Sequence, residues 1–90
     1  MDSPSFDRQE IKRILEAALL TASEPLSISD LRNLFAEELS GDALRDILSE
    51  MEQDWRGRSV ELVNVASGWR FRARPEYHRL LERLNPQRPP

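Results

Sequence analysis

The sequence has no cysteine, and its 90 residues include only three glycines and one histidine. The absence of cysteine excludes disulfides, thiolate metal sites and cysteine nucleophiles. Gly41, Gly57 and Gly68 each stand at an expected break or turn, so there is no glycine-rich loop to cradle phosphate. His78 lacks a base–nucleophile pattern around it, and we expect it to be polar surface. We therefore predict that the protein is not an enzyme and binds no cofactor or metal ion.

Long apolar runs are missing as well. The longest uncharged stretch, Leu62 to Trp69, has eight residues, whereas a membrane-spanning helix needs about 20. The N-terminus, Met1-Asp2-Ser3-Pro4, has an acid where a signal peptide carries bases before an apolar run. Hydrophobic residues make up 39% of the chain and charged residues 32%, which is ordinary for a soluble domain. We expect one cytoplasmic domain with no membrane contact.

The charges are unevenly distributed along the chain. The net charge is −3, but residues 1–54 carry a balance of −8 and residues 55–90 a balance of +5. Lys12 is the only lysine, so the basic residues are almost all arginine. An acidic chain is poorly suited to indiscriminate DNA binding, although its basic C-terminal part can still contact phosphate locally.

Apolar residues recur at helical spacing from Asp7 onward. Pro25 cannot continue a helix and disfavours helical backbone at Glu24, so we expect the first helix to end near Ser23. After a short extended piece at residues 25–28, Ser29 is the expected N-cap of a second helix. Ser40-Gly41-Asp42 ends that helix and caps a third, which stops at Gly57. The three apolar stripes are Ile11, Ile14, Leu15, Ala18, Leu19 and Ala22; Leu31, Leu34, Phe35 and Leu39; and Leu44, Ile47, Leu48, Met51 and Trp55.

The pattern then changes to that of strands. Val60 to Val65 is rich in β-branched residues, Ala66-Ser67-Gly68 forms a turn, and residues 69–74 alternate between apolar residues and arginine. This predicts a β-hairpin with one face buried. Pro75 suits the first position of a final helix. The apolar stripe of that helix is Tyr77, Leu80, Leu81 and Leu84.

This order predicts a mainly α fold with a small β-hairpin, the winged-helix variant of helix-turn-helix. We expect a flexible N-terminal tail at residues 1–6, the winged-helix domain at residues 7–84 and a proline-rich linker at residues 85–90.

The predicted third helix has the wrong charge for reading DNA. In DNA-binding winged helices this helix enters the major groove with Arg, Lys, Asn and Gln on its exposed face. Residues 42–54 instead carry five acids and one base, Arg45. The acids follow helical spacing away from the apolar stripe and lack the loop pattern of a calcium site, so we expect a solvated face.

The wing leaves two interpretations open. Arg70, Arg72 and Arg74 project from one strand face, where they are placed to contact phosphates or a minor groove. They are equally placed to pair with acids such as Glu61 across the hairpin. We favour a structural or protein-partner role, and keep a DNA-binding regulator as the alternative.

Some apolar residues lie off the expected core stripes. Leu20 is on the first helix, Val63 and Val65 are on the strand face opposite Val60 and Leu62, and Trp69 flanks the hairpin turn. A contiguous patch of such residues marks a subunit interface. Leu20, Val63, Val65 and Trp69 are therefore our candidate residues for contact with a partner or a second copy.

Two segments of the chain carry a family resemblance. Residues 18–27 and, more specifically, the hairpin residues 57–77 resemble the N-terminal winged-helix domain of bacterial segregation and condensation protein B, ScpB. The most specific parts are Glu61-Leu62-Val63, Gly68-Trp69-Arg70-Phe71 and Arg74-Pro75-Glu76-Tyr77. The resemblance covers about residues 8–84.

This resemblance implies a non-enzymatic function. It implies an accessory subunit of the condensin-like complex of an SMC ATPase and the kleisin ScpA, in the cytoplasm at the nucleoid. It further implies homodimerisation through this first winged-helix domain. The kleisin contact is then made mainly by a second winged-helix domain, which we expect to be absent here.

Overall fold

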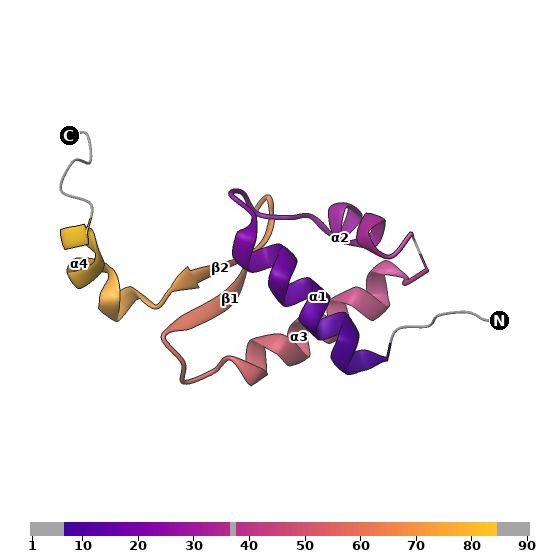
Figure 1. Ribbon diagram of the computed structural model, residues 1–90, viewed down its shortest axis with the longest axis horizontal. Coiled ribbons are helices and arrows are strands. Elements are labelled where there is room, and N and C mark those ends of the chain that lie inside the picture. Colours follow the sequence, from indigo (N-terminus) through magenta and orange to yellow (C-terminus); the bar gives the residue numbers. More distant parts are fainter. Residues whose placement is uncertain (1–6, 37, 85–90) are drawn as a thin grey trace.

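The computed structural model describes residues 7–36 and 38–84 (Figure 1). The elements are α1 (Arg8–Thr21), α2 (Ile28–Leu34), α3 (Gly41–Asp54), β1 (Val60–Val65), β2 (Gly68–Ala73), η1 (Pro75–Tyr77), α4 (His78–Leu81) and η2 (Glu82–Leu84). This order confirms the predicted fold class, mainly helical with one antiparallel hairpin in a winged-helix arrangement. The expected tails at residues 1–6 and 85–90 lie outside the described residues.

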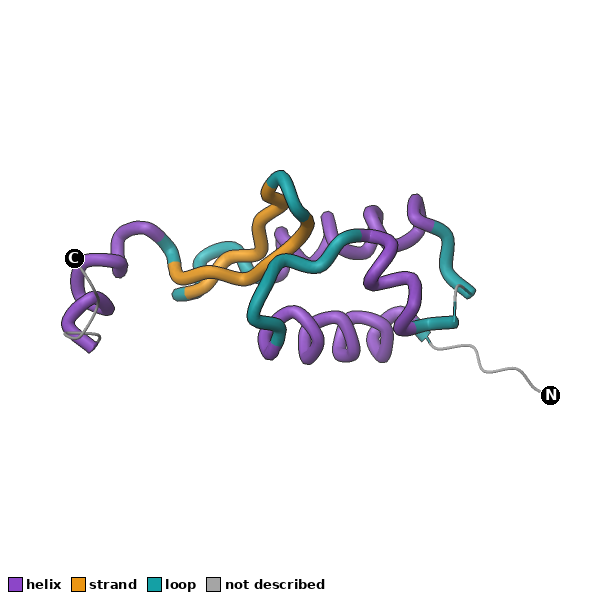
Figure 2. The backbone as a smooth tube through the Cα atoms, turned by 90° about the horizontal axis from the view of Figure 1, so that it is seen from above, coloured by secondary structure: helices purple, strands orange, loops and turns teal. Residues whose placement is uncertain are grey.

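One core forms where α1, α2 and α3 meet the hairpin (Figures 1 and 2). The helical stripes predicted for residues 11–22 and 44–55 supply most of it, because their apolar side chains return to one face every three or four residues. Trp69 and Phe71 of β2 pack against it while remaining partly exposed. The buried residues are Ile11, Leu15, Leu19, Leu31, Phe35, Leu44, Ile47, Leu48, Met51 and Leu62.

The second helix begins two residues earlier than predicted. Its N-cap is Ser27, not Ser29, because Ser27 and Asp30 form a capping box. Ser27 Oγ accepts a hydrogen bond from Asp30 N, and Ser27 N donates to Asp30 Oδ2, both at 3.0 Å. The helix also ends before Leu39, and Leu34 lies on its exposed side. The first helix ends at Thr21, slightly before the expected Ser23.

The hairpin forms as predicted and gains a third short partner. β1 pairs antiparallel with β2, with Leu62 opposite Phe71 and Val63 opposite Arg70. Leu26 then bridges to Trp69 on the other side of β2, through two backbone hydrogen bonds of 2.9 and 2.8 Å. This bridge ties the segment between α1 and α2 to the wing.

The final predicted helix is broken into three short pieces. A 3₁₀ turn (η1), one helical turn (α4) and a second 3₁₀ turn (η2) replace the single helix. They extend beyond the end of the hairpin, away from α1, α2 and α3 (Figure 2). No residue of these three pieces is buried, so the expected apolar stripe faces outward. We call residues 75–84 the arm.

Candidate functional site

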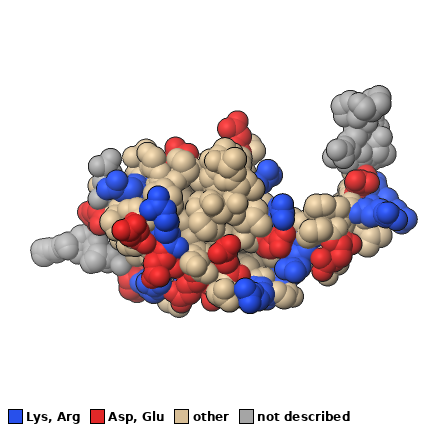
Figure 3. Space-filling view, turned by 180° about the vertical axis from the view of Figure 1, so that it is seen from behind, with Lys and Arg blue, Asp and Glu red and all other residues tan. Residues whose placement is uncertain are grey.

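Carboxylates of α3 are tied to α1 by ion pairs. Arg8 bonds Asp46 Oδ2 at 3.0 Å and Glu50 Oε1 at 2.6 Å. Lys12 Nζ lies 2.9 Å from Glu50 Oε2 and 2.7 Å from Asp54 Oδ2. The three acids lie at the surface, as expected for a solvated face, but they are also paired, since α1 packs beside α3 and brings two bases to them. On the face shown in Figure 3, acidic and basic groups lie intermixed.

These ion pairs shift the pKa of their members. The pKa of Glu50 is lowered, first by the hydrogen bond from Lys12 and then by that from Arg8. The pKa of Lys12 is raised by its bonds to Asp54 and Glu50, and that of Arg8 by its bonds to Glu50 and Asp46. All of these shifts favour the charged forms. Sequence periodicity showed the acids but not their partners, because the pairing depends on how two helices far apart in the chain pack.

The wing arginines differ in how they are engaged. Arg72 Nε bonds Glu61 Oε2 at 2.9 Å across the hairpin. Arg74 lies 3.7 Å from Glu61 and 3.5 Å from Glu76. Arg70 is exposed, and within residues 7–36 and 38–84 it forms no ion pair. Two of the three arginines therefore follow the pairing interpretation, and Arg70 does not among the described residues.

The structure distributes the four candidate interface residues over several surfaces. Leu20 is 50% exposed at the end of α1. Val63 and Val65 are partly exposed on the outer hairpin face, whereas Trp69 packs against the core. They share no single hollow: Leu20, Val63 and the pair Val65 and Trp69 line three different ones.

The hollow beside Leu20 is the most apolar of these. It has a volume of ≈ 210 Å³ and lies between the end of α1 and strand β2. Leu19, Leu20, Phe71 and Ala73 form its apolar wall, and Glu24, Arg70 and Arg72 supply charges of both signs. Such a surface suits an apolar side chain flanked by charged residues.

The arm holds the largest group of exposed apolar side chains. Tyr77, Leu80, Leu81 and Leu84 are 40%, 57%, 45% and 80% exposed. The helical spacing of these four residues predicted one face of a helix, and the structure leaves that face exposed. The sequence did contain a signal for this exposed surface, because a stripe of four apolar residues followed a hairpin that already closed the core.

Two further features are absent from the part of the chain that the structure describes. Within it, no three His, Asp or Glu side chains come together as a metal site. No helix among the same residues is long and apolar enough to cross a membrane.

Comparison with protein families gives a clear match. Residues 13–90 match the family model described as segregation and condensation complex subunit ScpB. A segregation and condensation protein B homolog of Coxiella burnetii (strain RSA 493 / Nine Mile phase I) is 42% identical over 80 residues, which are 87% of this chain and 38% of that protein. The chain spans less than half the length of the curated relatives it matches.

Solved structures resemble the fold over most of its length. ScpB from Mycobacterium tuberculosis aligns with a TM-score of 0.81 and 26% identity, covering 97% of this chain and 56% of that one. A dimer of an ScpB N-terminal domain complexed with an ScpA peptide aligns with a TM-score of 0.74 and 26% identity. This alignment includes 84% of this chain and 95% of the other chain.

Proposed function

This chain belongs to the ScpB family of segregation and condensation complex subunits, and on that premise we propose that it acts without catalysis, as an accessory subunit. It works through protein–protein contacts in a complex of an SMC ATPase and the kleisin ScpA. Its place is the cytoplasm, at the nucleoid, where it assists chromosome condensation and segregation. Homodimerisation is part of this role.

The acidic third helix is the observation that carries this proposal. Helix α3 occupies the position of the DNA-reading helix, yet residues 42–54 supply five acids and only one base, Arg45, for contact with phosphate. Asp46, Glu50 and Asp54 hold α1 in place instead. A winged helix with this charge supports contact with proteins rather than with a DNA groove.

Self-association has support from the relatives. The solved ScpB N-terminal domain that is almost wholly covered by this chain is a dimer. We therefore place the dimer contact within this winged helix. Leu20, Val63, Val65 and Trp69 remain proposed partner-contact residues, and Leu20 is the most exposed of them. The same solved domain is complexed with an ScpA peptide, so we propose that this winged helix takes part in the kleisin contact and that a second domain in the longer family members makes most of it.

The test is the mass of the chain in solution. The chain weighs 10.5 kDa, and light scattering over a concentration series should approach twice that mass. A second titration, with an ScpA peptide, should show binding by this chain, because the solved ScpB N-terminal domain is complexed with such a peptide, and tighter binding by a full-length relative. A monomer at every concentration, together with no kleisin binding by the full-length relative, would remove the proposal.

A DNA-binding regulator is the second candidate, because Arg70 is exposed and forms no ion pair with another described residue. A mobility shift with duplex DNA at low salt that is abolished in Arg70→Glu/Arg72→Glu would support it. Arg13→Glu/Arg79→Glu, at exposed positions outside the wing, changes the net charge by the same amount and is the matched control. No shift at low salt would exclude this candidate.

A further inference from the structure

The arm exposes more apolar surface than its own contacts explain. Helix α4 packs mainly on its flanking turns η1 and η2. A helix of four residues has too few hydrogen bonds to be stable alone, since isolated helices shorter than ~12 residues are marginal in water. The outward leucines, Leu80, Leu81 and Leu84, therefore need a surface to cover them.

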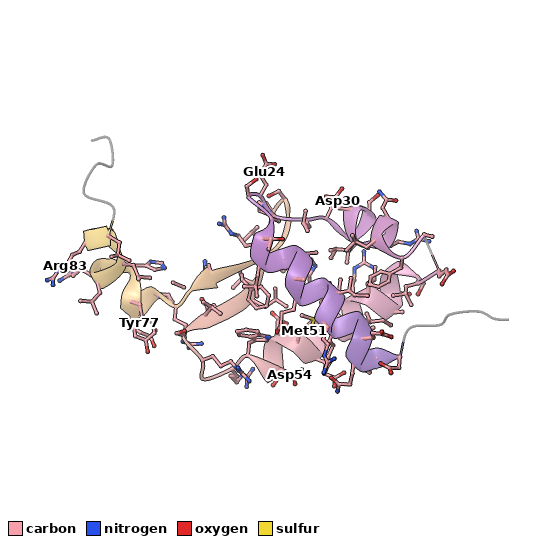
Figure 4. All side chains as sticks on the ribbon, in the orientation of Figure 1. Glu24, Asp30, Met51, Asp54, Tyr77 and Arg83 are labelled. Carbon is pink, nitrogen blue, oxygen red and sulfur yellow. The ribbon has the colours of Figure 1, made fainter. Side chains whose placement is uncertain are left out.

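The base of the arm is fixed to the hairpin. His78 Nε2 donates to the carbonyl oxygen of Ala73 at 3.0 Å, and Tyr77 N donates to that of Arg74 at 2.9 Å. Arg74 also lies near Glu61 and Glu76. These contacts direct the arm away from α1, α2 and α3. In Figure 4, Tyr77 and Arg83 accordingly lie far from the core residue Met51. The arm is thus oriented before any partner binds.

A surface that can receive an apolar side chain lies next to the base of the arm. The hollow beside Leu20 includes Ala73, next to the base of the arm, together with Leu19 and Phe71. Its volume of ≈ 210 Å³ exceeds the roughly 150 Å³ of a protein cavity that holds a benzene ring. It therefore has room for an inserted leucine side chain.

A second copy of the chain fits this pair of surfaces. No residue of the arm is among those that line the hollow of the same copy. In a two-fold dimer each copy supplies one arm and one hollow, and both contacts form at once. Both surfaces carry charges of both signs, Glu24, Arg70 and Arg72 on the hollow and Arg79, Glu82 and Arg83 on the arm, so opposite charges are available for pairing around the contact.

We propose that the arm of one copy, through Leu80, Leu81 and Leu84, docks in the hollow formed by Leu20, Phe71 and Ala73 of a second copy. This inference rests on the self-association proposed above and names the surfaces that carry it. Val63 and Val65, on the outer hairpin face, then stay available to other proteins of the complex.

Cross-linking between copies tests the pairing directly. The chain has no cysteine, so Leu81→Cys can be made in one chain and Leu20→Cys in another chain with a size tag. Mild oxidation of the mixture should give the mixed disulfide dimer. The matched control replaces Leu20→Cys with Leu34→Cys, which is similarly exposed on α2 and should give little mixed product. Equal product from both mixtures, or product only from the control, would overturn the arm contact.

Substitution in the arm gives an independent measurement. Leu81→Asp/Leu84→Asp should raise the dimer Kd by at least about 30-fold, as for loss of an interface hot spot, while Leu34→Asp leaves it unchanged. Circular dichroism should show both variants folded, because the changed side chains are exposed. A wild-type dimer that the arm variant leaves intact would overturn this inference alone. A wild-type monomer at every concentration would overturn the proposed self-association itself.

Discussion

At the scale of single residues, Gly68 fixes how the wing meets the rest of the domain. Its φ of +145° is a conformation that side-chain-bearing residues rarely adopt. A Cβ at this position would also collide with the carbonyl group of Leu26 and lie 2.9 Å from Ser27 N. The close approach exists because Leu26 pairs with Trp69. Gly68 therefore permits both the turn and the short third strand.

We expect Gly68→Ala to destabilise the protein by about 2 kcal/mol or more, from backbone strain together with the clash against Leu26. Gly57→Ala is the matched control. Gly57 also has positive φ, +83°, but an added Cβ would meet nothing within 4 Å. Its cost should be only about 1–2 kcal/mol. Urea unfolding followed by circular dichroism compares the two, and an equal loss would show that the Leu26 contact does not matter.

At the scale of elements, α2 depends on its N-cap. Ser27→Ala removes the hydroxyl that accepts from Asp30 N, and should cost about 1 kcal/mol. That corresponds to a fall in Tm of about 4–8 °C for a domain of this size. Ser29→Ala, on an exposed position of the same helix, should change stability by less than about 0.5 kcal/mol. The opposite ranking would mean that Ser29 is the cap.

The ion pairs between α1 and α3 make stability depend on pH. Because the folded protein lowers the pKa of Glu50 below its ordinary value of 4.5, the unfolded chain takes up the proton first. The contribution of Glu50 is therefore fully present above pH 4.5 and is lost as pH falls through the folded pKa. Lys12 behaves oppositely, and its contribution is lost as pH rises through a folded pKa that lies above 10.5.

Thermal unfolding from neutral to acidic pH should show this loss, and Glu50→Gln should lower Tm at neutral pH while making the acid decline shallower. Asp42→Asn is the control, because the Asp42 carboxylate is almost fully exposed and pairs within its own helix with Arg45. The Asp42→Asn variant should show the same fall in Tm toward acidic pH as the unchanged protein. An unchanged pH profile in Glu50→Gln would show that the α1–α3 pairs do not stabilise the fold.

Patterns local to one element were predictable from the sequence, and relations between elements were not. The stripes through Leu15 and Leu48 fixed the buried faces, and the alternation through Phe71 fixed the hairpin. The pairing of Lys12 with Glu50 depends on how α1 crosses α3, which periodicity does not determine. The arm was assigned to a helix because Leu80 and Leu84 follow helical spacing. Spacing shows that such residues share a face, but not whether the chain itself covers that face.

At the scale of the whole molecule, charge and apolar surface have separate roles. The acidic residues 1–54 and the basic residues 55–90 would attract each other between copies if charge drove association. In the proposed dimer the contact is instead made by leucines of the arm and apolar side chains of the hollow. The two explanations differ in how they respond to salt, because salt screens exposed charges and does not weaken apolar burial.

The dimer Kd should therefore change by less than about threefold between about 50 mM and about 500 mM NaCl, since screening acts only on the charges at the rim of the contact. Sedimentation equilibrium at both salt concentrations measures it. Arg83→Glu provides the comparison. Because this residue of the arm is charged, the substitution should alter the small dependence of the dimer Kd on salt without abolishing the dimer. A Kd that rises tenfold or more, about 1.4 kcal/mol, would assign association to the opposite charges of the two halves. The arm would then serve a different partner, and Leu81→Asp would leave the dimer unchanged.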